Sequence, residues 1–325
     1  MSVTDMRSRR LRTLFYGMTH EHAPGKIDTL RKLTDVFEIV AIVDDTARRA
    51  PTFFTAPFDA SGFRVVSEDE ARTMSDIDVV LVETANRDLM EIAGIYAECG
   101  IAMHCDKPCG EAMEPYRTLV EKCRTKNVPF QIGYMYRGNP ALKWIWKFVA
   151  EGGLGEVRYI EADMNHNYQA EGYPEYLSTF KAGILYNLGC HLVDMVLPLV
   201  RGDLIEAHPF TDVTRGSSFL RFEGTDVLLR TSTNMPGGIL CRRLRVDGTK
   251  GTIDLCPIER FDGRNLTLTL TVGETVKTTD FGVQTDRYAD QLLDLAAIVR
   301  GEKPNDQDYD RDLQTHETTL RACGL

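Results

Sequence analysis

Lys107 and His191 are the side chains of this sequence best suited to chemistry on oxygen. Lys107 lies in Cys105-Asp106-Lys107-Pro108, where an apolar segment ends. An ammonium group at such a place can stabilise a developing alkoxide or polarise a carbonyl. His191 lies in the segment Gly183–Asp194, and an imidazole can exchange a hydroxyl proton near neutral pH. We therefore expect chemistry at a hydroxyl or carbonyl group of a small molecule.

Both side chains also allow a plainer interpretation. We predict a helix over Leu188–Val200. Asn187, His191 and Asp194, near its start, would share one polar stripe of this helix. His191 would then be a core histidine bonded to Asp194, and Lys107 would be a loop lysine before a proline. The sequence leaves these alternatives open.

The segment after the first predicted strand is Gly17-Met18-Thr19-His20-Glu21-His22-Ala23-Pro24-Gly25. A nucleotide-binding turn in a doubly wound fold is rich in glycine and leads into a helix N-terminus. Against the pattern G-x-G-x-x-G, this segment keeps only Gly17, with Thr19 and His22 at the other glycine positions. It is compatible with a nucleotide turn that uses Gly17, Thr19 and His20, and equally with an ordinary turn.

Asp44 and Asp45 follow the second predicted strand. A carboxylate at that strand end accepts hydrogen bonds from a ribose diol and repels a 2′-phosphate. We therefore expect Asp44 to favour NAD over NADP. Two solvated turn aspartates are the alternative, and Arg48 and Arg49 just beyond them keep NADP open.

His20 and His22 are residue types that bind metals, but no set of carboxylate or cysteine ligands accompanies them in the sequence. The eight cysteines form no C-x-x-C pair and are few for a chain of 325 residues. We therefore expect no metal site, reduced thiols and a cytoplasmic location.

Strands and helices alternate through the first third of the chain. Apolar strands separated by helices are typical of a doubly wound parallel sheet, because such strands are covered on both faces. The predicted strands span residues 11–17, 37–44, 77–83, 101–105 and 130–134, and the predicted helices span 26–33, 89–99 and 115–125.

The pattern changes after about Arg137. Strands joined by short turns such as Asp247-Gly248 are typical of a mostly antiparallel sheet. The predicted strands span residues 157–163, 217–222, 226–233, 239–246, 252–255 and 266–272, with helices over 139–150, 188–200 and 287–299. We predict an α/β protein with a nucleotide-binding domain over residues 1–136 and a second domain over 137–325.

Charge and composition exclude several classes of protein. The formal charge is −10, from 38 basic and 48 acidic residues, and 43% of the residues are hydrophobic. A nucleic-acid partner is disfavoured because phosphate binding needs a concentrated cationic face. Apolar runs such as Val79–Val82 are far shorter than the ~20 residues of a membrane-spanning helix. We expect a compact enzyme with a small-molecule substrate.

The motifs, in this order, resemble the glucose-fructose oxidoreductase / inositol dehydrogenase / rhizopine-catabolism (Gfo/Idh/MocA) family. Cys105-Asp106-Lys107-Pro108 resembles its E-K-P motif, with aspartate in place of glutamate. Gly183–Asp194 resembles its G-G-x-L-x-D-x-G-x-H-x-x-D motif, and residues 132–137 and 153–157 resemble the sequence between them. The resemblance spans nearly the whole chain.

This resemblance implies a fold, an activity and an assembly. The fold is an N-terminal Rossmann domain followed by a C-terminal α/β domain with a large open sheet. The activity is hydride transfer between a nicotinamide cofactor and a hydroxyl of a sugar or cyclitol. The assembly is a homodimer or homotetramer through the C-terminal sheet.

The resemblance also implies roles for single residues. Lys107 would orient the reacting oxygen and contact the nicotinamide ribose, His191 would be the acid/base, and Asn187 stands where an aspartate usually assists. Thr84 and Asn86 match a T-P-N segment that lines the nucleotide. The full expected cofactor-binding set is Gly17, Thr19, His20, Asp44, Thr84, Asn86, Asp106, Lys107 and Pro108. The candidate substrate-selecting residues are Tyr136, Arg137, His166 and Tyr168, in addition to Asn187 and His191.

Asn187 departs from the family motif. A neutral amide can orient a hydroxyl or an imidazole, but it cannot stabilise an imidazolium as a carboxylate does. Two other functions therefore stay open beside an NAD-dependent dehydrogenase. One is a glycosidase or lyase that oxidises a sugar carbon transiently and regenerates NAD in the same cycle. The other is a non-catalytic sensor that binds NAD, although an intact Lys107 and His191 argue against it.

Overall fold

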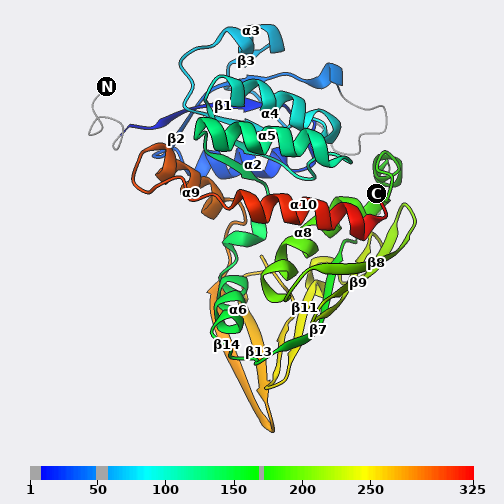
Figure 1. The fold of residues 1–325 in the computed structure, drawn as a ribbon. Helices are drawn as coiled ribbons and strands as arrows, with labels where there is room; N and C mark the ends of the chain where they lie inside the picture. The colour runs from blue at the N-terminus through cyan, green and yellow to red at the C-terminus, as the bar shows by residue number, and fades with distance from the viewer. Residues whose placement is uncertain (1–8, 49–57, 168–171) are drawn as a thin grey trace. The chain divides into compact units, whose positions relative to one another are not determined.

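The structure is a computed structural model that describes residues 9–48, 58–167 and 172–325. The chain forms two compact units, each with its own sheet (Figure 1). The first unit comprises Met1–Gly133 and Tyr288–Leu313, and the second comprises Tyr134–Arg287 and Gln314–Leu325. The predicted division was residue 136, whereas the first unit ends at Gly133, and Tyr288–Leu313, predicted for the second domain, groups with the first unit.

The first unit contains a six-stranded sheet in the order β3-β2-β1-β4-β5-β6. Its strands are β1 (Leu11–Tyr16), β2 (Phe37–Val43), β3 (Val65–Val66), β4 (Val79–Val82), β5 (Ala102–Cys105) and β6 (Phe130–Ile132). All of their pairings are parallel. The strand order reverses at β1, which is the switch point where a doubly wound sheet binds its ligand. The predicted doubly wound parallel sheet is confirmed.

Helices cover both faces of this sheet (Figure 1). They are α2 (Ala23–Lys32), α3 (Glu68–Thr73), α4 (Leu89–Glu98), α5 (Met113–Lys126) and α9 (Ala289–Val299). Ile27 of α2 and Leu292 of α9 join Phe15 and Leu81 in one buried cluster. On the other face Tyr16 packs edge-on against Tyr96 of α4, with ring centroids 5.9 Å apart. The apolar side chains of α9 explain why this late segment folds with the first unit.

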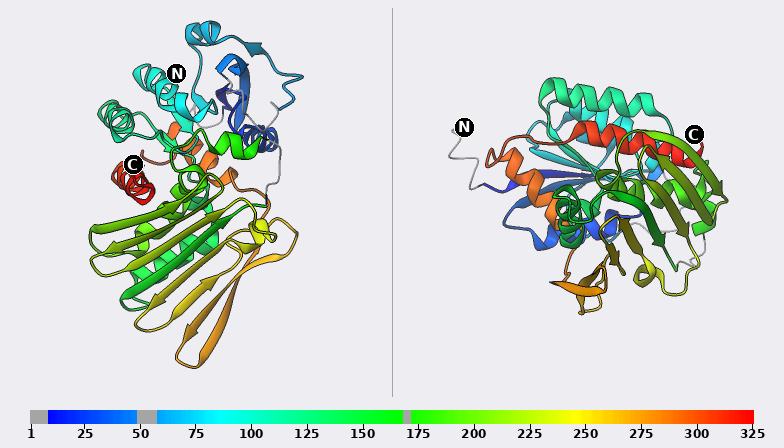
Figure 2. Two further views of the ribbon diagram at one scale, coloured as in Figure 1. Left: turned by 90° about the vertical axis from the view of Figure 1, so that its right-hand side faces the viewer. Right: turned by 60° about the horizontal axis from the view of Figure 1, so that its bottom comes forward.

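The second unit is built on an eight-stranded sheet in the order β14-β13-β12-β11-β7-β10-β9-β8 (Figure 2). Its strands are β7 (Val157–Asn165), β8 (Leu204–Thr211), β9 (Arg215–Phe222), β10 (Asp226–Ser232), β11 (Arg243–Gly248), β12 (Thr252–Leu255), β13 (Asn265–Val272) and β14 (Thr275–Val283). β7 and β10 pair in parallel, and the other neighbours are antiparallel. The mostly antiparallel sheet is confirmed. β8 and β14 were not predicted; they are the two edge strands and carry mostly exposed or half-buried residues.

Helix α8 (Gly183–Val196) packs on β7, β9 and β10, and all of its residues are buried. It begins at Gly183 instead of the predicted Leu188. Gly183 has φ of +51°, and a Cβ there would lie 2.7 Å from the backbone of Val213, so the helix start needs glycine. His191 therefore lies inside the helix and not beside its start.

The remaining helices are α6 (Pro140–Ala150), α7 (Tyr173–Leu177) and α10 (Tyr309–Cys323), of which the sequence analysis predicted only the first. Asn139 caps α6, because its Oδ1 accepts the N–H groups of Ala141 and Leu142 at 2.9 and 3.2 Å. Across the described part of the chain, every helix is too short or too polar to cross a bilayer.

Candidate active site

The turn after β1 is fixed to the ends of two neighbouring strands. Gly17 has φ of +103°, and a Cβ there would lie 2.7 Å from the backbone of Glu83, so the turn needs glycine at this position. The Met18 N–H and the Thr19 hydroxyl donate to the carboxylate of Asp45 at 2.7 and 2.6 Å. The side chain of Thr19 thus ties the turn to the end of β2.

The two aspartates after β2 have different surroundings. Asp45 is buried, and this burial raises the pKa of its carboxyl group. Asp44 is exposed, and its Oδ1 accepts the Thr46 N–H at 2.9 Å. The alternative of two solvated turn aspartates is therefore wrong for Asp45, and Asp44 is the carboxylate that a ligand at this strand end would meet.

Arg48 is engaged inside the first unit. Its guanidinium donates to both carboxylate oxygens of Glu68, at 2.6 and 2.8 Å. A bidentate pair of this kind orients the guanidinium toward the carboxylate. Arg49, the other arginine that kept NADP open, lies outside the described residues.

Lys107 follows β5 and is held through its backbone and its side chain. Its N–H donates to Asp106 Oδ1 at 2.6 Å, and its carbonyl accepts from Asn86 Nδ2 at 3.0 Å. The same carbonyl lies 3.0 Å from His20 Nε2. The ammonium group lies 3.1 Å from Glu21 Oε1, and the Lys107 side chain is fully buried. Four residues expected at the cofactor, Lys107, Asp106, Asn86 and His20, are thus brought together.

A buried charged cluster adjoins this group. Lys26 Nζ lies 2.6 Å from Glu83 Oε1 and 2.6 Å from Asp106 Oδ2, and all three side chains are buried. Burial raises the pKa of Glu83 well above its ordinary value. Although burial alone would raise it, the pKa of Asp106 is held well below its ordinary value by His20, Lys26 and His22. The Lys26 ammonium thus bridges two buried carboxyl groups, Glu83 and Asp106.

His20, His22 and Asp106 place three possible metal-ligand atoms within 4.8 Å of one another. The proximity of Asp106 to the two histidines was not predicted, because this carboxylate comes from the end of β5. However, His20 Nδ1 accepts the His22 N–H at 3.1 Å, and Lys26 Nζ binds Asp106 at 2.6 Å. Burial also lowers the pKa of His20 to about 4, so its ring is neutral. The arrangement fits the lysine ammonium better than a divalent ion.

In the second unit, Asn187 and His191 lie one turn apart on α8, and both are buried. The His191 ring packs edge-on against the rings of Tyr134 and Tyr136, with centroids 6.3 and 5.3 Å away. Such contacts fix the plane of the imidazole. The structure therefore brings the two predicted α8 residues together and orients one of them.

Tyr136 and Arg137 make polar contacts within the second unit. The Tyr136 hydroxyl donates to Glu259 and accepts from Arg242, both at 2.7 Å, and Glu259 and Arg242 form a buried ion pair. Arg137 donates to Asp194 Oδ1 at 2.9 and 2.6 Å. Asp194, which was considered as a partner of His191, thus pairs with Arg137.

The other two predicted substrate residues lie before α7. His166 Nδ1 lies 3.1 Å from the Tyr173 hydroxyl, and the side chain of His166 is buried. Tyr168 lies outside the described residues.

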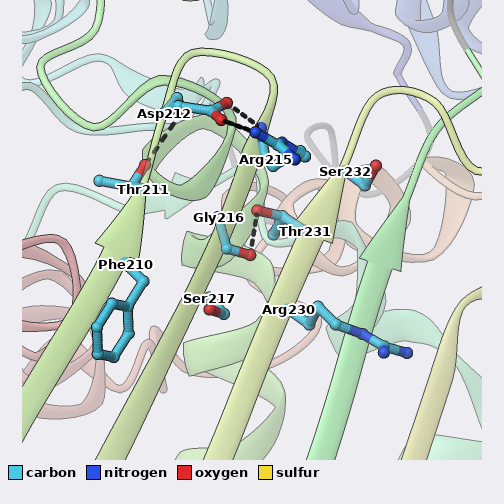
Figure 3. Close-up of a pocket in the computed structure, with 9 residues that line it drawn as sticks. All are labelled: Phe210, Thr211, Asp212, Arg215, Gly216, Ser217, Arg230, Thr231 and Ser232. Atoms are coloured by element: carbon cyan, nitrogen blue, oxygen red, sulfur yellow. Dashed lines mark hydrogen bonds and ion pairs between the residues drawn. The ribbon is translucent and has the colours of Figure 1, made fainter.

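A separate hollow of about 440 Å³ opens at the ends of β8, β9 and β10, on the face opposite α8 (Figure 3). Both of its arginines are paired, Arg215 with Asp212 at 2.8 Å and Arg230 with Asp163 at 2.7 Å. None of the predicted site residues is among the described residues that line it. The hollow is therefore not part of the candidate site.

Comparisons with known proteins cover both units. Residues 16–134 match the family described as "Oxidoreductase family, NAD-binding Rossmann fold", and residues 143–254 match "GFO/IDH/MocA C-terminal domain". D-apiose dehydrogenase from Paraburkholderia graminis is 24% identical over 277 residues, which are 77% of this chain and 68% of that protein. Trans-1,2-dihydrobenzene-1,2-diol dehydrogenase from Oryctolagus cuniculus is 24% identical over 240 residues, which are 68% of this chain and 70% of that protein.

Among solved structures, KijD10, a 3-ketoreductase from Actinomadura kijaniata in complex with NADP and TDP-benzene, has a TM-score of 0.79. Its sequence is 14% identical to this chain, and the aligned region covers 96% of each protein. This similarity shows the same fold. The relatives give no support to the two alternatives of a transient-redox glycosidase and a non-catalytic sensor.

Proposed function

Because the chain belongs to the Gfo/Idh/MocA family of oxidoreductases, we propose that it is an NAD-dependent dehydrogenase acting on a hydroxyl of a sugar, cyclitol or sugar derivative. The observation that carries this proposal is the placement of Lys107. It is fixed at the carboxyl end of β5, in the same parallel sheet whose other strand ends carry the Gly17 turn and Asp44. Ligands of doubly wound sheets bind at this edge.

The residues of this edge fit a dinucleotide. Gly17 makes the tight turn, and the first turn of α2 carries no acidic residue, so its N-terminus remains favourable for a phosphate. Asp44 is an exposed carboxylate at the end of β2. When bound, the nicotinamide accepts the hydride during oxidation and donates it during reduction.

We propose NAD as the cofactor because of the charges near Asp44. An exposed carboxylate repels a 2′-phosphate and can accept hydrogen bonds from the ribose hydroxyls. Arg48, which could bind that phosphate, is already paired with Glu68. NADP in the KijD10 structure is a property of that protein.

The chemical roles follow from the side chains that are present. The Lys107 ammonium would stabilise negative charge on the reacting oxygen. His191 would remove the hydroxyl proton during oxidation and return it during reduction. Asn187, one turn away on α8, would orient the hydroxyl or the imidazole. Tyr136, Arg137 and His166 would line the substrate site. Their hydrogen bonds within the second unit would hold these side chains in place.

The sheet face opposite α8 supports an assembly of identical chains. It carries cross-strand pairs of both signs, such as Arg243 with Asp254, and the side chain of Phe210 is 73% exposed there. A twofold interface needs a face that can pair with its own copy, and a face with both charge signs and an exposed aromatic side chain meets that need. We therefore propose a homodimer or homotetramer through this face, to be tested by sedimentation velocity.

The test of the function is direct. Purified protein is mixed with NAD, or with NADP, and a panel of sugars, cyclitols and sugar acids, and nicotinamide absorbance is followed. We expect reduction of NAD by at least one class of polyol. A protein that binds NAD but reduces it with no member of the panel would contradict the proposal.

A further inference from the structure

We propose that Glu21 is a positioning residue for Lys107. The Glu21 carboxylate lies 3.1 Å from the Lys107 ammonium, and the two side chains are 6% and 0% exposed. This inference rests on the proposed function, because Lys107 is the side chain proposed to act on the reacting oxygen. It assigns the placement of the ammonium group to a residue of the turn after β1.

The charges around Lys107 single out Glu21. A buried ammonium group is unfavourable unless a carboxylate compensates the water that it has lost. Two other buried carboxylates of this unit, Glu83 and Asp106, lie 2.6 Å from Lys26. Asp106 reaches Lys107 through the backbone N–H, and His20 faces the carbonyl of Lys107. Glu21, in contrast, contacts the ammonium group itself, at 3.1 Å.

The rest of the turn supports the same role. Thr19 binds Asp45, His20 faces the Lys107 carbonyl, Glu21 faces the Lys107 ammonium, and His22 Nδ1 lies 3.1 Å from Asp106 Oδ2. These four consecutive residues replace most of the glycine pattern. Their side chains join the turn to the strand ends that carry Lys107. The departure from G-x-G-x-x-G thus has a use, which is to hold the Lys107 segment in place.

The position of Glu21 also has a chemical consequence. A carboxylate 3.1 Å away favours the charged form of an amine. Lys107 would therefore act as a hydrogen-bond donor and a stabiliser of negative charge, and the proton transfer would fall to His191. Removing the Glu21 charge should loosen the ammonium group and weaken the reaction without removing any group that meets the substrate.

The first experiment needs no knowledge of the substrate. Lysines of the folded protein are labelled by reductive dimethylation near neutral pH, and the rate at Lys107 is followed by mass spectrometry. We expect Lys107 to be protected in the wild type and to be labelled at least about fivefold faster in Glu21→Gln, because the charge partner is gone. Lys147, whose side chain is 75% exposed, serves as the internal reference.

The matched control is Glu98→Gln. Glu98 binds Lys126 at 2.7 Å on the protein surface, so this variant removes a lysine partner elsewhere in the same unit. It should leave the labelling rate of Lys107 unchanged. An unchanged Lys107 rate in Glu21→Gln would overturn the proposal, whatever the activity of the variant. If Glu21→Gln does not fold, Glu21→Asp replaces it, because its shortened carboxylate should also raise the labelling rate of Lys107.

The second experiment uses the substrate found by the panel. We expect Glu21→Gln to lower kcat about tenfold, with the Kd for NAD changed less than about twofold. Glu21→Asp should recover part of kcat because it restores the charge. Loss of NAD affinity with an unchanged kcat would overturn the positioning role. If the wild type is silent with every substrate, the proposed function fails, and the labelling of Lys107 still decides the contact.

Discussion

The hydroxyl of Thr19 donates a 2.6 Å hydrogen bond to the carboxylate of Asp45, and both side chains are fully buried. This contact joins the turn after β1 to the end of β2. The Asp45 carboxylate therefore accepts its hydrogen bonds from the protein itself, whereas its neighbour Asp44 is exposed at the strand end. The two adjacent aspartates thus have different surroundings, and Asp44 is the one that we propose for the ribose.

Replacement of Asp44 by alanine should change cofactor preference. Loss of the carboxylate removes hydrogen bonds to the ribose and the repulsion of a 2′-phosphate, so the NAD-to-NADP affinity ratio should fall about tenfold. The ratio is measured by titrating both nucleotides. The control is Asp28→Ala, which removes an exposed carboxylate of α2 paired with Arg31. An unchanged ratio would remove Asp44 from the nucleotide site.

Replacement of Lys107 by alanine should lower kcat more than tenfold, an estimate for the loss of a group that stabilises developing charge. The circular dichroism spectrum should stay that of the wild type. Lys143→Ala, an exposed position of α6, is the matched control. Normal turnover in the Lys107 variant would contradict the proposed role of Lys107 in stabilising charge on the reacting oxygen.

Asn187→Asp should raise kcat about fivefold, because a carboxylate one helical turn from His191 stabilises an imidazolium. Asn187→Leu, which keeps the volume but not the polar group, should lower kcat. Both variants are compared at saturating substrate across the pH range. Equal rates for the Asp and Leu variants would show that position 187 does not assist the proton transfer.

His20 should make the first unit sensitive to acid. Burial lowers its pKa from 6.5 to about 4 in the native state. Between these values the unfolded chain binds a proton that the native state does not, so stability is fully present above pH 6.5 and falls as the pH falls toward 4. From pH 7 to pH 5 this loss is about 2 kcal/mol.

The measurement compares urea unfolding of the wild type and His20→Asn at both pH values. Asparagine keeps an acceptor for the His22 N–H but does not titrate. The pH-dependent loss should therefore be smaller in the variant by about the amount assigned to His20. Burial also raises the pKa of Glu83 and lowers the pKa of His104, a residue of β5, to about 3. Both groups are present in both proteins, so their contributions largely cancel in the difference. Equal pH dependence in the two proteins would contradict the assignment.

Arg137 should matter for the stability of the second unit. It compensates the Asp194 carboxylate, which is 1% exposed, so Arg137→Met should cost about 3 kcal/mol of unfolding free energy. The double variant Arg137→Met, Asp194→Leu should recover most of this loss, because no unpaired buried charge remains. Equal destabilisation in the single and double variants would show that the ion pair is not the cause.

Much of the architecture followed from local sequence patterns. The apolar strands β1, β2, β4 and β5 were predicted to within two residues at each end, because strands buried on both faces must be apolar along their length. The inner strands of the antiparallel sheet were predicted from their alternation of buried and more exposed residues. Its edge strands β8 and β14 were missed, because strands that bury little apolar surface show no clear pattern.

The residues of the candidate site could be predicted only in part from the sequence. Lys107, His191 and Asn187 stood out by residue type and motif alone. The partners themselves were decided by the tertiary structure: Asp106 meets His22 and Lys26 because parallel strands end at one edge of the sheet. The return of α9 to the first unit was decided in the same way, by an apolar face that the first sheet covers. Sequence alone thus determined which residue types stand in the motifs and at the predicted strand ends, and folding determined which charges neutralise one another, because that depends on neighbours in space and on the loss of water.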